Sequence, residues 1–154
     1  MKTIQLTNST EVALVDDEDY AYLNQFRWLL NSDGYVIRYD NNNSLIYMHR
    51  EVIALSKKEK ADHKNTLRND NQKLNLRPAT TSQNGMNRKK QSKPCSSKYK
   101  GVYWEKRDNM WRARIKLVGK RINLGSFLKE IDAALAYNKA AIKYFGQFAK
   151  LNEV

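Results

Sequence analysis

Residues 111–117 read WRARIKL, a stretch in which apolar residues and cations alternate without interruption. Successive side chains of a β-strand point to opposite faces, so Arg112, Arg114 and Lys116 share one face at spacings of roughly 6.6 Å. The opposite face is apolar and must pack against another element of the fold. The stretch therefore predicts a β-strand in a sheet with one packed face and one cationic face.

The residues that follow supply partners for this strand. Residues 120–124 repeat the alternation, and the Val118-Gly119 link is short enough to form a hairpin. Residues 129–145 have helical periodicity, and Gly146 stands where a C-cap glycine is expected. We therefore predict an α+β fold in which a helix covers the apolar face of the sheet. The stripe expected to make this contact is Ile131, Ala134, Leu135, Ala141, Ile142 and Phe145.

The net charge of +12 is distributed unevenly along the 154 residues. Residues 1–48 carry a net charge of −4, whereas residues 49–96 and residues 97–154 each carry +8. Cations gathered in this way indicate a polyanionic partner. Nucleic acid is favoured over an acidic protein or an anionic membrane.

The cationic face of the predicted sheet is the first candidate for that contact. The major groove of DNA is about 12 Å wide and admits a β-ribbon, and arginine pairs with guanine there. A solvated strand edge that uses charge to prevent aggregation is the alternative, but it would carry mixed charge. The candidates for base or phosphate contacts are Arg112, Arg114, Lys116 and Arg121, with Tyr103 and Asn123 as polar companions.

Several short motifs lie within residues 97–152: YKGV at 99–102, WRARI at 111–115, LGSF at 124–127, AALAY at 133–137 and AKLN at 149–152. As a set they resemble the plant ethylene-response-factor (AP2/ERF-like) type of DNA-binding domain. The resemblance implies a three-stranded antiparallel sheet docked into the major groove of double-stranded DNA, with a helix packed behind it. The positions that would contact DNA are Lys100, Gly101, Tyr103, Arg114, Lys116, Arg121 and Asn123.

Three of these positions depart from the pattern of that family. Tyr103 stands where arginine is usual, Arg114 where glutamate is common, and Asn123 where tryptophan is common. The departures affect the DNA sequence that would be recognised more than the mode of binding.

Residues 88–97, RKKQSKPCSS, have no apolar periodicity and are predicted to connect two domains. We place the linker at residues 91–98, between a first domain of residues 1–90 and a second of residues 99–154. The cations fit a solvated tether and equally a basic strap on a phosphate backbone. In the second case Arg88, Lys89 and Lys90 would contact DNA.

The first domain contains a second informative stretch, DHKNTLRNDNQKLNLRPATTSQN at residues 62–84. An acidic residue directly precedes one of the chain's two histidines, and asparagines follow at Asn71, Asn75 and Asn84. A carboxylate, an imidazole and amide oxygens can form a site for a hard cation beside a general base. The single cysteine, Cys95, excludes a thiolate-rich zinc site. The set fits the hydrolysis of a phosphodiester.

The spacing of five short motifs supports this interpretation: MHR at 48–50, DH at 62–63, DN at 70–71, NLR at 75–77 and SQN at 82–84. Together they resemble the HNH endonucleases of introns and phages over about residues 10–90. Asn75 and Asn84 stand twelve and twenty-one residues after His63, as in that family. The combination with the downstream sheet domain resembles a class of mobile-element nuclease.

This resemblance implies a ββα-metal nuclease motif at about residues 48–86. Asp62 and Asn84 would hold one Mg²⁺ or Mn²⁺ ion, and His63 would activate water. Asn75 would either hold the second nitrogen of the imidazole or fix the loop.

Two further residues of the motif each have two alternative roles. Arg77 would grip a phosphate or pair with an acid, and His49 would pack in the interior or contact the substrate. The turn after His63 lacks the glycine that is frequent in the family, so Asn65 is expected to adopt the left-handed conformation there.

The rest of the first domain reads as short strands separated by turns, with a hairpin around Asp40–Asn43. A short helix is predicted over Asp17–Phe26. A second is predicted over residues 69–77, with Leu74 and Leu76 as its apolar contacts and Pro78 at its end.

The sequence thus predicts a metal-dependent, site-specific DNA endonuclease, acting as a monomer or weak dimer. A non-catalytic, sequence-specific DNA-binding regulator is the main alternative, and an RNA-binding protein ranks third. No apolar run is long enough to span a membrane, and the N-terminus lacks the layout of a signal peptide. A lone cysteine fits the reducing cytoplasm, which we expect to be that of a bacterial or phage-infected cell.

Overall fold

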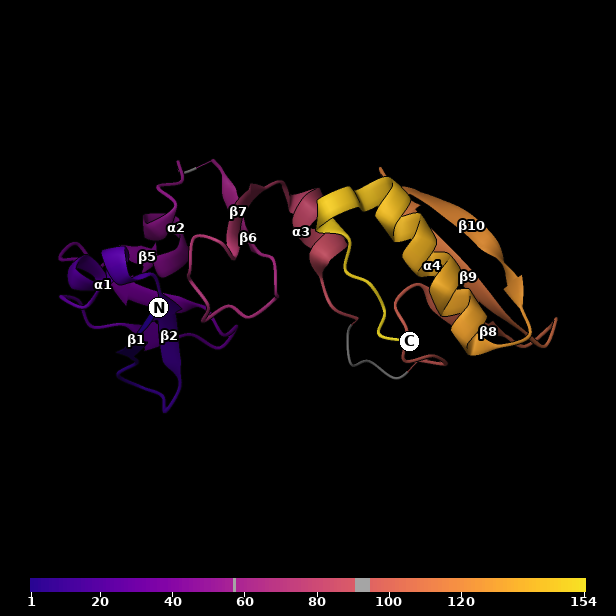
Figure 1. Cartoon of the computed structure of the whole chain (residues 1–154), viewed down its shortest axis with the longest axis horizontal. Helices are drawn as coiled ribbons and strands as arrows, with labels where there is room; N and C mark the ends of the chain where they lie inside the picture. Colours follow the sequence, from indigo (N-terminus) through magenta and orange to yellow (C-terminus); the bar gives the residue numbers. More distant parts are fainter. Residues whose placement is uncertain (57, 91–94) are drawn as a thin grey trace. The chain divides into compact units, whose positions relative to one another are not determined.

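The computed structural model describes residues 1–56, 58–90 and 95–154 (Figure 1). The chain forms two compact units, Met1–Thr81 and Ser82–Val154. Most of the predicted linker lies outside the described residues, and the predicted domain limits stay a prediction. The described residues form a mixed α+β fold with small antiparallel sheets.

The N-terminal unit begins with two such sheets. β1 (Lys2–Gln5) pairs with β2 (Val12–Val15). In the second sheet β4 (Val36–Tyr39) lies between β3 (Leu29–Leu30) and β5 (Leu45–Tyr47). The connection between β4 and β5 confirms the hairpin that the sequence predicts there.

Helix α1 (Asp17–Leu23) is shorter than the helix predicted to reach Phe26. Its first turn is acidic, which complements the positive end of the helix dipole, and Asn24 ends it. The tertiary contact that fixes this end is a hydrogen bond from the Trp28 indole N–H to the Leu23 carbonyl oxygen at 2.8 Å.

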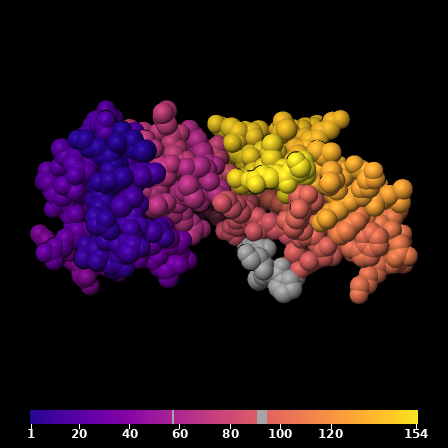
Figure 2. All heavy atoms as spheres, turned by 60° about the horizontal axis from the view of Figure 1, so that its bottom comes forward, coloured from indigo at the N-terminus to yellow at the C-terminus, as the bar shows by residue number. Residues whose placement is uncertain are grey.

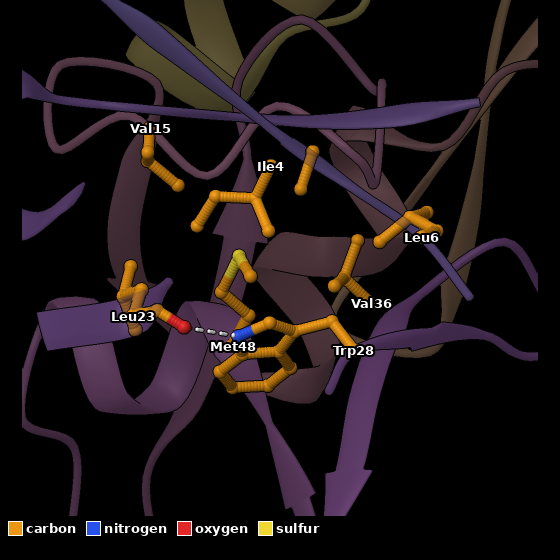
Figure 3. Close-up of a cluster of buried hydrophobic side chains, with 8 residues drawn as sticks. Ile4, Leu6, Val15, Leu23, Trp28, Val36 and Met48 are labelled. Carbon is orange, nitrogen blue, oxygen red and sulfur yellow. Dashed lines mark hydrogen bonds between the residues drawn. The ribbon is translucent and has the colours of Figure 1, made fainter. Parts of the chain in front are cut away.

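These elements share one hydrophobic core (Figure 3). Trp28 is fully buried at its centre, and its indole N–H is satisfied within the core. Met48, the first residue of α2 (Met48–Val52), is also fully buried, so the core fixes the position of the next residue, His49. The complete set is Ile4, Leu6, Ala13, Val15, Leu23, Trp28, Val36 and Met48.

A third pair of strands follows, β6 (Lys60–His63) and β7 (Leu76–Ala79), which are antiparallel and place Asp62 opposite Arg77. Next in the chain is α3 (Thr81–Asn87), so the elements occur in the order ββα.

The prediction of a helix over residues 69–77 is wrong, because these residues form no helix. The backbone of this segment is instead bound to the edge of β2, with hydrogen bonds from Leu14 N to Asn69 O at 2.9 Å and from Asn71 N to Leu14 O at 2.8 Å. Asparagine and aspartate side chains also compete with helical hydrogen bonds, which favours such a turn. Leu74, predicted as an apolar contact, is 85% exposed.

The C-terminal unit contains a three-stranded antiparallel sheet of β8 (Val102–Glu105), β9 (Met110–Leu117) and β10 (Lys120–Phe127), with β9 in the centre. This confirms the predicted strand at residues 111–117 and the two-residue hairpin after it. Helix α4 (Glu130–Phe145) packs on the apolar face of the sheet, as Figure 1 shows.

The face that α4 presents to the sheet differs in part from the prediction. Ile131, Leu135 and Ile142 are 51%, 48% and 58% exposed. Small residues let a helix approach a sheet closely, and alanines therefore occupy most of the contact. The buried residues of α4 are Ala133, Ala134, Tyr137, Ala140, Ala141 and Phe145.

The C-terminal end of the chain returns to the start of this domain. Gly146, at φ 51°, ends α4 as predicted, and a short 3₁₀ helix (Gly146–Phe148) follows. The Lys100 N–H then donates to Asn152 Oδ1 at 2.6 Å, and Figure 2 shows the last residues, in yellow, beside the segment around residue 100. None of the helices in the described parts of the chain is long and apolar enough to cross a membrane.

Candidate functional site

Asp62 and His63 end strand β6, and both side chains are buried, with 8% and 5% exposure. The cross-strand register determines the partner of Asp62. Arg77 lies directly opposite on β7, and its Nε and Nη2 both donate to Asp62 Oδ2, at 2.8 and 2.5 Å. Of the two roles left open for Arg77, the structure contains the pairing with an acid, and a phosphate contact stays a prediction.

The His63 imidazole has Asn71 as a polar neighbour, with Nε2 and Asn71 Oδ1 3.4 Å apart. Burial lowers the pKa of His63 below its ordinary 6.5. The Asn71 contact and the carboxylates of Asp62 and Asp70 oppose this shift, but burial is the larger effect. The imidazole is therefore neutral near pH 7 and able to accept a proton.

His49 lies against His63 in a cluster of rings. The two imidazole centroids are 5.2 Å apart, and Tyr35 and Tyr47 each lie 5.4 Å from His49. Burial, followed by the neighbouring charges of His63 and Arg50, lowers the pKa of His49 to about 3. With 8% exposure, the His49 side chain has the interior packing role that was one of its two predicted alternatives.

Asn75 braces the loop between β6 and β7. Its Nδ2 donates to the Asp70 carbonyl at 2.7 Å, and its Oδ1 accepts from the Asn65 N–H at 3.0 Å. This is the loop-fixing role of the two that were predicted. The side chain that lies near the imidazole is that of Asn71, for which the sequence indicated no role. Its only signal was the DN motif that precedes Asn75 by four residues.

The turn after His63 also differs from the prediction. Thr66, at φ 68°, takes the left-handed conformation expected of Asn65. The Asn65 side chain is used instead to hold the turn, because its Oδ1 accepts from Leu67 N at 2.8 Å and its Nδ2 donates to Asp70 Oδ2 at 2.7 Å. A polar side chain that bonds the local backbone thus replaces the usual glycine.

Asn84, the second predicted metal ligand, lies on α3 and belongs to the C-terminal unit, whereas Asp62 and His63 belong to the N-terminal unit. Among the residues that the structure describes, no cluster of three or more His, Cys, Asp or Glu side chains could hold a metal ion. A carboxylate oxygen and an amide oxygen are each hard ligands of the kind that suit Mg²⁺ or Mn²⁺, and metal binding by Asp62 and Asn84 stays a prediction.

The solvent face of the C-terminal sheet carries most of the predicted DNA contacts. Lys116 lies opposite Arg121 and Arg114 opposite Asn123, and all four side chains are exposed. The Arg114 guanidinium lies 4.6 Å from the centroid of the Tyr103 ring, which orients it.

Arg112 lies beside Tyr103 on the same face and forms an ion pair with Asp108. This acid lies in the turn before β9, outside the alternating stretch that predicted the cationic face. Asp108 also pairs with Arg107, so one carboxylate orients two guanidinium groups at this end of the sheet.

Lys100 and Gly101 have clear structural roles. The Lys100 Nζ donates to the carbonyl oxygens of Met86 and Arg88, at 2.6 and 2.8 Å. Gly101 has φ 78°, and a Cβ there would lie 2.1 Å from Tyr137 Cδ2 and 2.6 Å from the Arg114 carbonyl oxygen. Close packing therefore requires glycine, and DNA contact by either residue stays a prediction.

The basic segment before residue 91 has mixed surroundings. Arg88 and Lys89 are exposed, as a strap on DNA would need. Lys90 is half-buried, and its Nζ donates to the Tyr99 carbonyl oxygen at 2.8 Å. Contacts of these three residues with DNA stay predictions.

The geometry described so far defines a two-part protein, with a buried histidine site in one unit and a cationic sheet face in the other. Two groups of known proteins are similar to the chain. The chain is 29% identical over 148 residues to a protein named Uncharacterized HNH endonuclease L560 from Acanthamoeba polyphaga mimivirus, a match that covers 92% of this chain and 75% of that protein. This is distant homology to an HNH endonuclease over most of the chain.

A second group of relatives matches part of the chain. APETALA2-like protein 2 from Oryza sativa is 42% identical over 57 residues, and the AP2-like ethylene-responsive transcription factor TOE2 from Arabidopsis thaliana is 41% identical over 59 residues. These matches cover 37% and 38% of this chain, and 13% and 12% of those proteins. No protein-family model matches the chain. The two resemblances expected from the sequence are thereby confirmed.

Proposed function

We propose that the protein is a metal-dependent, site-specific DNA endonuclease of the HNH type. The observation that carries the proposal is the buried His63 imidazole, whose pKa is lowered by burial and which stands directly after Asp62 in β6. Distant homology to a protein named an HNH endonuclease supports the same conclusion. A neutral imidazole can act as the general base of a hydrolysis at neutral pH.

In this mechanism His63 accepts a proton from the water that attacks the scissile phosphate. Asn71 and the rings of His49 and Tyr35 orient the imidazole and keep water from its sides. Asp62 and Asn84 would hold one Mg²⁺ or Mn²⁺ ion. When bound, such an ion stabilises negative charge on the phosphate and on the leaving oxygen.

The C-terminal sheet would bring DNA to this site. Partial homology to AP2-like proteins supports a DNA-binding role for this domain. Lys116 and Arg121 form an exposed cationic pair across β9 and β10, suited to phosphates. Arg114, stacked on Tyr103, is pre-oriented for a base edge. One catalytic site per chain suits a monomer, or a weak dimer on DNA.

The experiment is cleavage of supercoiled plasmid and genomic DNA in Mg²⁺, in Mn²⁺ and in EDTA, with run-off sequencing of the products. We expect nicked or linear DNA with either metal, none in EDTA, and cleavage at defined positions. Intact DNA from the wild-type protein in every metal would overturn the proposal. So would a His63→Ala variant that cuts as fast as the wild type.

One observation favours the non-catalytic DNA-binding regulator as the second candidate. Arg77 already neutralises Asp62, so this carboxylate has a structural reason to be present. If this pairing fully explains why Asp62 is present, DNA retention will be independent of metal. Exchanging Asp62 and Arg77 for a well-packed apolar pair will then leave the regulatory function intact. Loss of metal-dependent cleavage in the exchanged protein would reject this candidate.

A further inference from the structure

The loop between β6 and β7 carries an arginine, Arg68, shortly after His63. Its surroundings differ from those of Arg77, which is 9% exposed and is engaged with Asp62. Arg68 is exposed, and in the parts of the chain that the structure describes no carboxylate lies within ion-pair distance of its guanidinium. Of these two arginines, Arg68 is therefore the one whose charge is available to an anion from solvent.

The guanidinium of Arg68 is oriented although it is exposed. It stacks on the Tyr35 ring, 4.4 Å from the centroid, and its Nη1 donates to the Asp33 carbonyl oxygen. Both partners belong to the turn between β3 and β4, where Asn31 Oδ1 accepts from the N–H groups of Asp33 and Tyr35 at 3.0 and 2.8 Å. A guanidinium has five N–H donors, so most of them remain available for a ligand.

The backbone on both sides of Arg68 is fixed as well. The Leu67 N–H donates to Asn65 Oδ1 at 2.8 Å, and the Asn69 carbonyl oxygen accepts from the Leu14 N–H at 2.9 Å. A long side chain loses conformational entropy when it binds a ligand, and that loss is smaller when the side chain is already held. Arg68 is thus prepared for binding rather than free in solvent.

Tyr35 connects this arginine with the predicted catalytic histidine. Its ring centroid lies 6.0 Å from that of His63 and 5.4 Å from that of His49. Burial is the largest cause of the lowered pKa of His63, and the nearby charge of Arg68 acts in the same direction. All four residues belong to the N-terminal unit, so their arrangement involves no contact with the C-terminal sheet.

We propose that Arg68 is a further DNA-contacting residue, whose guanidinium binds a backbone phosphate beside His63 and is positioned by Tyr35. Arginine suits this role because its planar fork can donate two parallel hydrogen bonds to phosphate oxygens. That the phosphate is the one cleaved rests on the proposed nuclease function. The contact with the DNA backbone does not. The competing role for Arg68 is a brace between its own loop and the Asp33 turn.

The test compares Arg68→Met with the wild type in the full-length chain. Binding to duplex DNA in EDTA, measured over a range of salt, should weaken on the order of tenfold, and the salt slope should fall by about one. Single-turnover cleavage in Mg²⁺ should fall by about 10- to 100-fold, because a cation at the reacting phosphate is lost. The urea midpoint should stay at the wild-type value, which a brace would not allow.

Matched variants separate the role of the charge from that of its orientation. Arg27→Met removes another exposed arginine of the same unit and should change none of these measurements. Arg68→Lys should restore the salt slope but only part of the cleavage rate, because an ammonium lacks the planar fork. Tyr35→Leu should keep the slope and slow cleavage, whereas Tyr35→Phe keeps the stacked ring and should cleave as the wild type does. Circular dichroism checks folding, and Arg68→Gln replaces Arg68→Met if the latter does not fold.

A chemical change in the DNA locates the phosphate. Once the cleaved position is known, a neutral methylphosphonate placed there should weaken wild-type binding in EDTA. It should weaken binding by Arg68→Met no further, because the side chain that meets this charge is already absent. An equal loss in both proteins would overturn the contact with the cleaved phosphate.

An Arg68→Met protein with a wild-type salt slope and a lowered urea midpoint would overturn the proposal and make Arg68 a structural brace. A lowered slope with wild-type cleavage would overturn its place beside His63. If the wild-type protein cuts no DNA in any metal, the nuclease function fails, and the salt slope in EDTA still decides whether Arg68 contacts the DNA backbone.

Discussion

The predicted catalytic residues of β6 and the DNA contacts predicted on the C-terminal sheet lie in opposite environments. His63 and Asp62 are at most 8% exposed, and each has a close polar neighbour. Lys116, Arg121 and Asn123 stand on an open sheet face. The difference in exposure is what their proposed roles require. A proton acceptor is tuned by removing water, whereas a cation that binds a phosphate backbone must remain in water until the backbone arrives.

The sharpest test of this contrast separates chemistry from binding. His63→Ala should reduce cleavage by about 10²- to 10⁴-fold, because the general base is lost. The affinity for DNA should stay within twofold, since His63 is not among the predicted DNA contacts. Single-turnover cleavage and electrophoretic mobility shift at one salt concentration measure the two effects. A parallel loss of binding would show that the buried residues also grip DNA.

The buried ion pair gives the next largest effect. Asp62→Ala leaves the Arg77 guanidinium buried without this partner, and breaking such a pair costs about 3–5 kcal/mol of unfolding free energy. Asp62→Ala combined with Arg77→Met should recover a large part of this loss, because no charge is then buried alone. Urea unfolding of the three proteins provides the values. Equal stability of the single and double variants would contradict the assigned pairing.

Burial of His49 makes stability depend on pH. Its folded pKa of about 3 lies below its ordinary 6.5, so its contribution is complete above about pH 6.5 and is lost as the pH falls toward 3. Between pH 7 and pH 5 the unfolding free energy should fall by about 2 kcal/mol from this residue. His49→Phe, measured by urea unfolding at both pH values, should lose less stability over this range. If the stability of His49→Phe depended on pH as that of the wild type does, burial of His49 would not be the cause of the pH dependence.

The smallest expected effects are those of single substitutions on the exposed face of the C-terminal sheet. Lys116→Ala should weaken binding to all DNA sequences alike and lower the salt slope by about one. Arg114→Ala should instead relax sequence preference, because its stacked guanidinium is oriented for a base. Binding to a randomised DNA library at two salt concentrations separates these results. If Lys116→Ala relaxed sequence preference and Arg114→Ala weakened binding uniformly, the roles assigned to Lys116 and Arg114 would have to be exchanged.

Local patterns predicted the C-terminal domain well. The alternation at residues 111–117 places cations and apolar residues on opposite faces in any strand, so the strand and its exposed face followed directly. The limits of α4 were also predicted to within one residue. Its buried face was predicted only in part: Ala134, Ala141 and Phe145 are buried as expected, but closeness of packing selects Ala133 and Ala140 over the larger Ile131 and Leu135.

Contacts between distant residues explain the other differences. Residues 69–77 lack a helix because Leu14, far away in the sequence, binds their backbone. Lys100 was predicted as a DNA contact from its place in a motif, and no local pattern indicates that its ammonium meets Met86 and Arg88. Spacing identified His63 and its asparagines as a group, but which amide lies beside the imidazole depends on the loop conformation.

The attachment of residues 69–71 to Leu14 has a consequence for any shortened form of the protein. Asn71 is held between the Leu14 carbonyl, which receives its N–H, and the His63 ring. Strand β2 is thus a structural support for the proposed base, although it contributes no side chain to the proposed chemistry. A form of the protein trimmed to residues 48–86 would keep the proposed catalytic residues and lose this support.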